Sequence, residues 1–466
     1  MTANAPPDSS PSKAHAPTLA EKLASYAERG VNRAKIAFTD VDGVLRGKYI
    51  SVDKLAALLR EGGGWCDCVF GWDLDDVLYD QGTFTGWHSG FPDARYQLHV
   101  DTERWLADEH CPLFLASFSL AANPPPPCPR TLLAHSLERL KDAGLILKAG
   151  FEYEFFVFAE TPESVREKGY RDLRPLTPGN FGYSVLRTGT HAELFTGLMD
   201  ECEQLAVPLE GLHTETGPGV WEAALAPAQG LDAADRAALF KTFAKTYFAR
   251  QGLLATFMAK WSMSVPGQSG HFHFSLLDAT GNNQFRDDQD ALGMSKLQRS
   301  ALAGVLKLLP EWLPMVAPTI NSYSRLVKGA WAPTAATWGM ENRTTAVRVI
   351  EGSGQRLECR VPGADSNPYL VASAMTAAAL TGIEQQLELT AATTGNAYEV
   401  ETELPEALQF AGTLRQATQR FARSSAAREA FGADWVEHFV MTRDWECREY
   451  ERNVNSWQLE RYFELI

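Results

Sequence analysis

The alternation of apolar and polar residues is clearest between Phe151 and Phe158, where the chain reads Phe-Glu-Tyr-Glu-Phe-Phe-Val-Phe. Aromatic and β-branched residues at this density predict a β-strand. Because successive side chains of a strand point to opposite faces, Glu152 and Glu154 are expected on the same face. Two neighbouring carboxylates are costly to desolvate unless a cation lies between them. The stretch therefore predicts either a cation site or a half-exposed strand whose glutamates are solvated.

Two later stretches repeat this arrangement of a polar pair on one strand face. The sequence Gly-His-Phe-His-Phe places His271 and His273 together, with aromatic residues on the other face. The sequence Leu-Glu-Cys-Arg-Val does the same with Glu358 and Arg360. Three such strands predict a polar cavity, lined by metal ligands, in a β-rich core. Oxygen-rich ligand sets favour hard cations, so we expect Mg²⁺ or Mn²⁺ rather than zinc.

The remaining patterns divide the chain into parts. A short helix from Leu19 to Arg29 precedes two alternating stretches, Lys35 to Val41 and Val44 to Ile50, and a tight Asp42-Gly43 turn joins these into a β-hairpin. The segment from Ala121 to Pro129, with four consecutive prolines, is the clearest linker. We therefore expect a disordered tail over residues 1–17, an N-terminal domain over residues 18–125 and a larger domain over residues 126–466.

One N-terminal segment admits a different interpretation. The stretch from Phe38 to Leu45 resembles the nucleophile motif of haloacid-dehalogenase-type phosphatases, and Asp73 to Asp76 could serve as their acidic metal motif. That fold needs parallel β-α-β units between the two motifs, but only about 30 residues separate them. The phosphatase interpretation is therefore the weaker alternative.

The overall composition limits the classes of function. The chain has 466 residues, of which 45% are apolar, and this is enough to bury a large core. A formal net charge of −15 argues against a nucleic-acid partner and favours small-molecule substrates. Seven cysteines without paired spacing suit a reducing compartment. The tail lacks the apolar run of a signal peptide. The apolar run from Tyr369 to Ile383 is too short to span a bilayer comfortably, so we expect it to form a buried helix. We expect a cytoplasmic protein with no membrane partner.

Two further groups of charged residues bear on the chemistry. Glu215 and Glu222 flank a Gly-Pro-Gly turn, which can bring both carboxylates to one region, although an ordinary polar turn is the alternative. Guanidinium groups bind phosphates and carboxylates bidentately. Five arginines fall within 36 positions of this acidic chain: Arg325, Arg343, Arg348, Arg356 and Arg360. Beside a metal site, they indicate a polyphosphate and a carboxylate as substrates.

These motifs, in this order, closely resemble those of class I glutamine synthetases. The resemblance covers nearly the whole chain after the tail and also includes Asn321 to Leu326, Asn342-Arg343 and Asp365 to Leu370. It implies an α+β fold with an N-terminal β-grasp domain and a catalytic, ATP- and glutamate-binding domain. The antiparallel sheet of the catalytic domain would form a partial barrel between subunits. The resemblance also implies a homo-oligomeric double ring, a dodecamer, with active sites between neighbouring subunits.

The resemblance implies a role for each matched residue. One divalent ion would be held by Glu154, Glu215 and Glu222, and a second by Glu152, His271 and Glu358. ATP would contact His273, Ser275, Arg348 and Arg356, with Arg343 at its γ-phosphate. Glutamate would be held by Gly267, Arg325, Arg343 and Arg360. The residues expected to act in catalysis are Glu152, Glu154, Arg343, Arg360 and Trp331 together with the N-terminal acids Asp73 and Asp76, and Asp75 is a further candidate for the acid that faces the amine.

The reaction implied by the resemblance begins when ATP phosphorylates the γ-carboxyl group of glutamate. An amine then attacks the γ-glutamyl phosphate and displaces phosphate. Two cations and several arginines would neutralise the charge on the transferring phosphoryl group.

The departures from the family pattern bear on the identity of the amine. Glutamine synthetases carry a glutamate in the loop Gly-aromatic-Glu-Ala-Pro, whereas this chain has Trp331 at that position. Pro266 stands where a glutamate-binding asparagine is expected, and the lysine expected near Ser353 is absent. An indole offers an apolar surface and a π-face, which suit an organic primary amine better than ammonium. The sequence therefore predicts a glutamate–amine ligase that makes a γ-glutamylamide. A glutamine synthetase that uses ammonia is the alternative, and a non-catalytic ring-forming relative is a more remote one.

Overall fold

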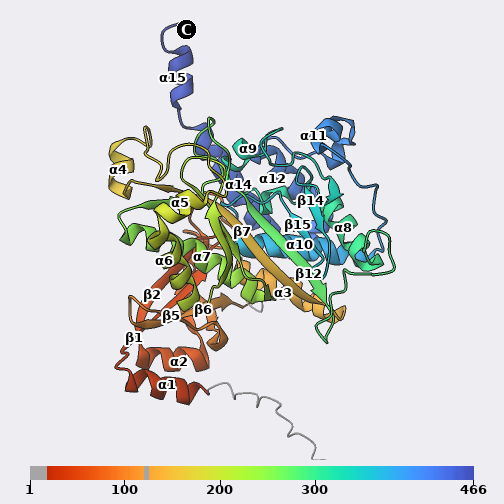
Figure 1. Cartoon of the computed structure of the whole chain (residues 1–466). Coiled ribbons are helices and arrows are strands. Elements are labelled where there is room, and N and C mark those ends of the chain that lie inside the picture. Colours follow the sequence, from red (N-terminus) through yellow and green to blue (C-terminus); the bar gives the residue numbers. More distant parts are fainter. Residues whose placement is uncertain (1–17, 120–124) are drawn as a thin grey trace, which may run out of the picture.

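Two β-sheets organise the chain (Figure 1). The computed structural model describes residues 18–119 and 125–466, so the tail predicted over residues 1–17 lies outside the described residues. The first sheet uses strands between residues 33 and 118, and the second sheet begins with the strand that starts at Ile146. Across these two described ranges, no helix combines the length and the apolar character that crossing a bilayer requires.

The first sheet is a mixed sheet with the strand order β2-β1-β6-β4-β3, and β5 pairs with β6. Its strands are β1 (Arg33–Thr39), β2 (Leu45–Ser51), β3 (Gly63–Cys66), β4 (Asp93–Leu98), β5 (Arg104–Leu106) and β6 (Cys111–Phe118), and the helices of this unit are α1 (Leu19–Glu28) and α2 (Val52–Glu61). The predicted hairpin is confirmed, because β1 and β2 pair antiparallel around Gly43, whose φ of 85° suits a tight turn. This antiparallel return replaces the parallel β-α-β unit that a phosphatase would need, so that interpretation is wrong.

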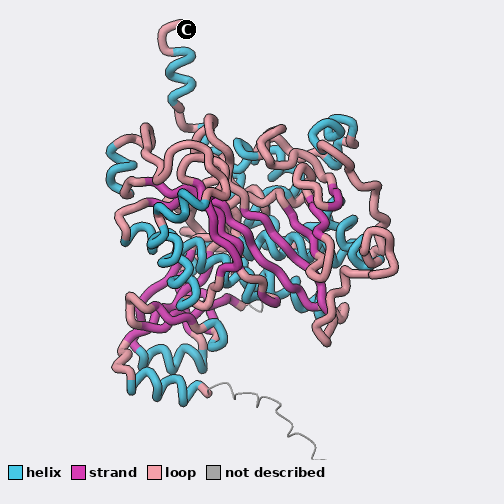
Figure 2. Tube along the Cα trace, viewed as in Figure 1, coloured by secondary structure: helices cyan, strands magenta, loops and turns pink. Residues whose placement is uncertain are grey.

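The second sheet has the order β13-β14-β15-β12-β7-β9-β8, and the short strands β10 and β11 pair with β7. The bounds are β7 (Ile146–Phe158), β8 (Leu209–Thr214), β9 (Val220–Leu225), β10 (Ala228–Gln229), β11 (Leu254–Thr256), β12 (Gly270–Leu277), β13 (Trp338–Met340), β14 (Val347–Ile350) and β15 (Arg356–Cys359). β7 and β12 run antiparallel through its centre (Figure 2). All pairings in this sheet are antiparallel except that of β13 with β14.

Helices cover one face of the second sheet. Tyr153 and Phe155 of β7 pack against Phe240 of α7, and Trp221 of β9 stacks on Phe195 of α6 with a centroid distance of 3.5 Å. The helices are α3 (Pro129–Asp142), α4 (Pro162–Glu167), α5 (Val185–Thr190), α6 (Ala192–Gln204), α7 (Leu231–Arg250), α8 (Lys296–Leu308), α9 (Ser322–Arg325), α10 (Pro368–Glu384), α11 (Ala397–Val400), α12 (Leu414–Arg423), α13 (Ser425–Phe431), α14 (Ala433–Glu451) and α15 (Ser456–Tyr462). The apolar run near residue 369 is the buried helix α10, as predicted, and it packs against α3, α7 and α8. Aromatic burial on this face leaves the opposite face for polar residues.

Candidate functional site

The register between neighbouring strands brings predicted polar residues to the uncovered face of the second sheet. Residues that lie directly opposite each other in paired strands point to the same side. Glu154 of β7 lies opposite Glu222 of β9, which in turn lies opposite His213 of β8. Glu152 of β7 lies opposite His271 of β12. The centre of the sheet therefore presents three carboxylates and two imidazoles on one face.

The same row continues beyond β12. His273 lies opposite Glu358 of β15, and Glu358 lies opposite Arg348 of β14. Side chains along a strand alternate between its two faces. A register shift of one residue would therefore place these side chains on opposite faces of the sheet. Strand pairing thus unites sequence patterns that lie more than 200 residues apart.

The first of two candidate metal sites is the Glu358 group, which consists of Glu152, His271 and Glu358. Their ligand atoms all lie within 4.8 Å of one another. The Nδ1 atom of His271 is 3.1 Å from an oxygen of Glu152 and 3.4 Å from an oxygen of Glu358. The Nε2 atom of His271 is buried and has no hydrogen-bond partner among the described residues. These three residues form the set that the family resemblance implies for one cation.

The second candidate site is the Glu222 group, which consists of His213, Glu215 and Glu222. The Nε2 atom of His213 is 3.2 Å from an oxygen of Glu215 and 3.4 Å from an oxygen of Glu222. Glu215 follows β8 directly and Glu222 lies in β9, so the Gly-Pro-Gly turn between them returns the chain to the same region. A histidine and two carboxylates in this arrangement can hold a divalent cation.

This group differs from the set predicted for it. The carboxylate of Glu154 accepts a hydrogen bond from the backbone N–H of Ser269 at 2.8 Å, and Glu154 is absent from the group of convergent ligand atoms. His213 takes the third place in that group, and the sequence interpretation missed it. The signal was available, because His213 precedes Glu215 by two residues, and residues at that spacing in a strand share a face.

Charge is distributed unevenly between the two groups. Burial raises the pKa of Glu222 to about 10, and the neighbouring carboxylates of Glu152, Glu154 and Glu215 contribute in the same direction. Burial also opposes ionisation of Glu358, but the imidazoles and guanidinium groups around it lower its pKa to about 2. The Glu222 group therefore lacks positive charge, which a cation would supply.

The guanidinium groups lie mainly beside the Glu358 group. Arg360 donates a hydrogen bond to Glu358 at 2.6 Å, and Arg348 donates one at 3.2 Å. Arg356 donates from Nε to Nδ1 of His273 at 3.3 Å. Burial lowers the pKa of His271, and the nearby Arg360 lowers it further, which favours the neutral imidazole that can bind a metal.

Two residues predicted to hold glutamate, Gly267 and Arg360, lie just beyond the same end of the antiparallel strands β12 and β15. Arg325 of α9 is only 2% exposed and donates to the carbonyl oxygen of Val361 at 2.8 Å and to the hydroxyl of Ser269 at 3.0 Å. A side chain at Gly267 would place its Cβ 2.7 Å from the Arg325 side chain, so glycine is required for the arginine to pass. Arg343 is exposed, and its carbonyl oxygen accepts a hydrogen bond from Arg360 at 3.1 Å. Ser275 is buried in β12, two residues beyond His273.

Trp331 lies in an exposed loop, and 65% of its surface is accessible. Its φ of 58° is unfavourable for a bulky side chain, and such strain is often found at functional sites. The loop is anchored directly after the tryptophan, because Tyr398 donates to the carbonyl oxygen of Ala332 at 3.4 Å and Thr334 binds the buried carboxylate of Glu401. The structure thus presents the indole to solvent on an anchored loop.

The predicted N-terminal acids bind other partners within this chain. Asp73 accepts a hydrogen bond from the indole N–H of Trp445 at 2.8 Å, and Asp76 forms an ion pair with Arg46 at 2.7 Å. Asp75 is exposed. Within residues 18–119 and 125–466, no hydrogen bond or ion pair joins these three acids to either metal group. Their role towards a neighbouring subunit stays a prediction.

Comparison with known proteins identifies the family of this site. The family model for the glutamine synthetase catalytic domain matches residues 126–462. The chain belongs to the glutamine synthetase family. Members of this family are ATP-dependent carbon–nitrogen ligases that use divalent metal ions, and this chain is such a ligase. The resemblance found in the sequence is therefore confirmed.

Individual relatives in the family differ in the amine that their names specify. Type-1 glutamine synthetase 2 of Dictyostelium discoideum is 44% identical over 93% of this chain and 84% of its own length. Glutamate–isopropylamine ligase of Pseudomonas sp is 33% identical over 96% of this chain and 98% of its own. Gamma-glutamylethanolamide synthetase of Streptomyces coelicolor is 35% identical over 97% of this chain and 96% of its own length. A solved structure described as a GmaS/ADP complex superposes with a TM-score of 0.82 at 26% identity and covers 95% of this chain and 99% of that one.

Proposed function

We propose that the protein joins the γ-carboxylate of L-glutamate to a primary amine and releases a γ-glutamylamide, with ATP as the phosphoryl donor and γ-glutamyl phosphate as the intermediate. The observation that carries this proposal is the single sheet face on which two metal-binding groups and a row of arginines meet. Charge develops on the transferring phosphoryl group in such a reaction, and fixed positive groups around it lower the barrier.

The two groups suit the divalent ions that the family uses, and we propose that these are Mg²⁺ or Mn²⁺. The donors are mostly carboxylate oxygens, which hard cations prefer. One ion would be held by Glu152, His271 and Glu358, and the other by Glu215 and Glu222 with Glu154 or His213. When bound, the ions polarise phosphoryl oxygens and offset the negative charge of the transition state.

The protein side chains then divide the remaining tasks. We assign ATP to His273, Ser275, Arg348 and Arg356, with Arg343 at the γ-phosphate, and glutamate to Gly267, Arg325, Arg343 and Arg360. The exposure of Arg343 supports this assignment, because its guanidinium group is accessible to a bound phosphate. Arg360 uses Nε and Nη1 for contacts within the protein, which leaves Nη2 available to a substrate carboxylate.

The preference for an organic amine rests on Trp331. An exposed indole can cover the apolar body of an amine, whereas a carboxylate at this position would favour a small cation. The names of the Pseudomonas and Streptomyces relatives, which specify isopropylamine and an ethanolamide, support this choice. The name of the Dictyostelium relative favours the alternative in which ammonia is the nucleophile.

Exchange of the tryptophan tests the choice between amine and ammonium. Trp331→Glu should shift the ratio of kcat/KM values towards ammonium, because contact of an alkyl group with the indole contributes roughly 1–3 kcal/mol, or about ten- to a hundredfold in selectivity. Trp331→Phe is the matched control and should retain most of the preference. ADP release with glutamate and a panel of primary amines, ammonium included, gives both values. A parent enzyme that uses ammonium as well as every amine tried would instead be a glutamine synthetase.

We further propose that the chain assembles into a double ring, a dodecamer, with a β-grasp N-terminal domain that completes a partial barrel at the neighbouring subunit. The C-terminal helix α15 supports assembly, because it projects from the body of the subunit (Figure 1), and the helix and the residues after it expose Trp457, Phe463 and Ile466. Asp73, Asp75 or Asp76 would then face the amine site of the neighbour.

Light scattering combined with activity measurement tests the assembly. The ligase activity should elute with a large closed oligomer, and dilution into subunits should abolish it. A fully active monomer would contradict shared active sites. A variant truncated after residue 453 should assemble less well, since it lacks the projecting apolar helix, whereas removal of the tail over residues 1–17 should leave assembly unchanged.

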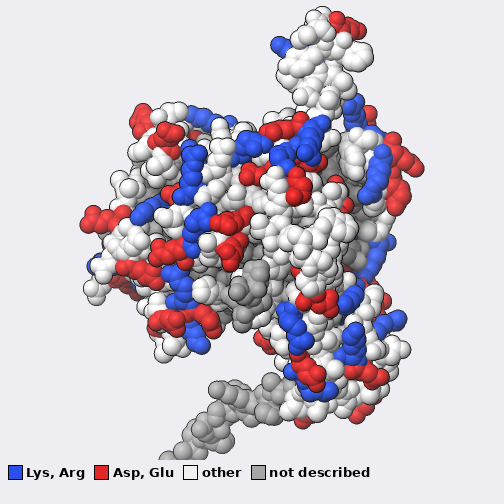
Figure 3. Space-filling model, turned by 180° about the vertical axis from the view of Figure 1, so that it is seen from behind, with Lys and Arg blue, Asp and Glu red and all other residues white. Residues whose placement is uncertain are grey.

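Two features support the expected surroundings of the enzyme. All seven cysteines are free, which suits the proposed cytoplasmic location. On the face drawn in Figure 3, basic and acidic side chains are interspersed, which agrees with small-molecule substrates rather than a nucleic-acid partner.

A further inference from the structure

A cavity of about 500 Å³ lies between the N-terminal unit and the larger unit, on the helix-covered side of β7. The β1–β2 hairpin closes one side of it with Asp42, Gly43, Val44 and Leu45, and α7 closes another with Lys241, Thr242, Lys245 and Thr246. Its walls also include Phe257, Met258, Thr319 and Asp365. A cavity of this size holds a small organic molecule. None of the residues of the two metal groups lines it.

Two lysines in this cavity lack a negative partner. Lys241 is 8% exposed, and its ammonium group donates to the carbonyl oxygen of Ser366 at 2.8 Å. Lys245, one helical turn further, has its ammonium group 5.6 Å from the centre of the Phe257 ring. Neither lysine forms an ion pair with any carboxylate in residues 18–119 or 125–466. Burial lowers the pKa of Lys241 to about 7, and Lys245 adds to the effect while Asp365 opposes it.

The two acids of the cavity are already engaged by other groups. Asp42 forms an ion pair with Arg443 of α14. The Oδ2 atom of Asp365 accepts hydrogen bonds from the hydroxyls of Thr319 at 2.8 Å and Ser322 at 2.6 Å. Asp42 is therefore neutralised by Arg443, whereas Asp365 is contacted, within the described residues, only by hydroxyl groups and still acts on Lys241. Lys245 is exposed and forms no ion pair among the described residues, so its ammonium group is accessible to an anion that enters the cavity.

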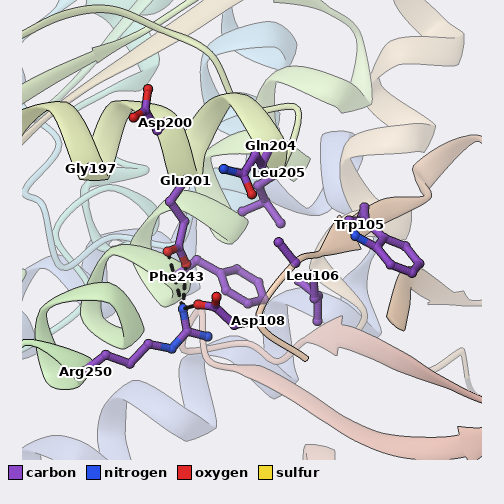
Figure 4. A pocket seen from close by; sticks show the side chains of 11 residues that line it. Trp105, Leu106, Asp108, Gly197, Asp200, Glu201, Gln204, Leu205, Phe243 and Arg250 are labelled. Atoms are coloured by element: carbon purple, nitrogen blue, oxygen red, sulfur yellow. Dashed lines mark hydrogen bonds and ion pairs between the residues drawn. The ribbon is translucent and has the colours of Figure 1, made fainter. Parts of the chain in front are cut away.

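A second pocket provides the contrast. The pocket in Figure 4, of about 120 Å³, contains Arg250 of α7, and its guanidinium group points towards Asp108 and Glu201. Both carboxylates form ion pairs with it. The cation there forms ion pairs within the protein, whereas neither lysine of the larger cavity forms one among the described residues.

We propose that the cavity between the two units binds a small organic carboxylate with an apolar body, and that its occupancy weakens glutamate binding. The two lysines and the surrounding threonine hydroxyls would receive the carboxylate. The apolar walls formed by Leu45, Phe257 and Met258 would contact the apolar part of this carboxylate. Inorganic phosphate has no such part.

The coupling to glutamate follows from the position of Asp365. This residue lines the cavity and holds Ser322 at the start of α9, and the same helix carries Arg325, the proposed glutamate ligand. Lys241 also lies 5.7 Å from the ring of Tyr153, the residue between Glu152 and Glu154. Because Lys241 also donates to the carbonyl oxygen of Ser366, the residue after Asp365, a ligand that draws Lys241 towards itself would disturb the backbone beside Asp365 and the contact with Tyr153. The effect on glutamate rests on the proposed function, but binding in the cavity does not.

Calorimetric titration of the full-length protein in the absence of ATP tests the binding directly. We choose phenylacetate as the probe, phenylacetamide as its neutral counterpart and inorganic phosphate as the alternative anion. Phenylacetate should bind, and Lys245→Gln should weaken it about tenfold or more through loss of a charge-assisted hydrogen bond. Lys245→Arg, which keeps the charge, and Lys141→Gln on the distant exposed surface of α3 should bind as the parent does.

Initial rates then test the coupling. Phenylacetate should raise the KM for glutamate about fivefold or more in the parent, and Lys245→Gln should abolish this effect. Competition at the active site itself would persist in Lys245→Gln and would overturn the proposed coupling. Equal binding of phenylacetate to the parent and Lys245→Gln, equal binding of phenylacetamide, or binding of phosphate in its place would overturn the assigned site.

Discussion

The two metal groups lie on the same sheet face and contain the same kinds of ligand, yet they differ in how their charge is balanced. In the Glu358 group, Arg348 and Arg360 donate directly to Glu358, and its pKa falls to about 2. In the Glu222 group, no arginine among the described residues forms an ion pair with Glu215 or Glu222, and the pKa of Glu222 rises to about 10. One group is compensated by the protein, and the other depends on a bound cation.

Similar ligand sets can therefore have opposite energetic roles. A compensated carboxylate is needed whether or not a metal is bound, because its removal would leave buried arginine partners unpaired. An uncompensated cluster stores repulsion that metal binding relieves. We therefore expect the Glu222 group to couple metal binding to stability much more strongly than the Glu358 group does.

The largest expected effect is on turnover, where the two groups should behave alike. Glu215→Ala and Glu152→Ala should each lower kcat/KM about a thousandfold or more, because each removes a ligand from one of two ions that share the phosphoryl charge. Glu154→Ala should be similarly inactive if that residue completes the second site. Measurement of ADP release at saturating Mg²⁺ checks this, and full activity in Glu152→Ala or Glu215→Ala would refute the assignment of the two groups.

The next largest effect is on the stability of the metal-free protein. Removal of one carboxylate charge should change that stability in opposite directions in the two groups. Glu358→Gln should destabilise the metal-free protein by about 3–5 kcal/mol, because two guanidinium groups lose their buried partner. Glu222→Gln should instead raise its melting temperature by about 1 °C for each kcal/mol gained, because glutamine does not have to take up a proton on folding as Glu222 does. Calorimetry of both variants after chelation gives the two shifts. A loss of stability in Glu222→Gln would show that the cluster is not repulsive without a cation.

The same difference between the two groups predicts that the stability of the metal-free protein depends on pH. Glu222 has a raised pKa, so its contribution to stability is present below about pH 4.5 and is lost as the pH rises towards 10. The metal-free protein should therefore melt at lower temperature at pH 9 than at pH 6, and excess Mg²⁺ should remove most of that difference.

The smallest effect is a proton count. At pH 7.5, binding of Mn²⁺ to the Glu222 group should release about one proton, because Glu222 is protonated without metal. The Glu358 group should release none, since Glu358 is already ionised and the pKa of His271 is lowered. Titrations in two buffers with different ionisation enthalpies measure the count. Glu222→Gln should abolish the release, and an unchanged count in that variant would contradict the comparison.

The sequence contained much of the site because strand periodicity is local. The period of two residues placed Glu152 with Glu154 and His271 with His273 on shared faces, and the Gly-Pro-Gly turn predicted the return of Glu222 towards Glu215. The same rule would have identified His213, which precedes Glu215 by two residues. The hairpin at Gly43 and the buried helix α10 also followed from local patterns.

The tertiary structure decided what each of these residues touches. Strand order placed β15 and β14 beside β12, so Arg348 reached Glu358, while β8 and β9 brought no arginine to Glu222. Pairing of distant strands depends on the whole sheet and on its buried aromatic face, and local periodicity does not specify it. For the same reason the sequence determined the chemical types at the site, and only the fold decided which carboxylates are compensated and which require a cation.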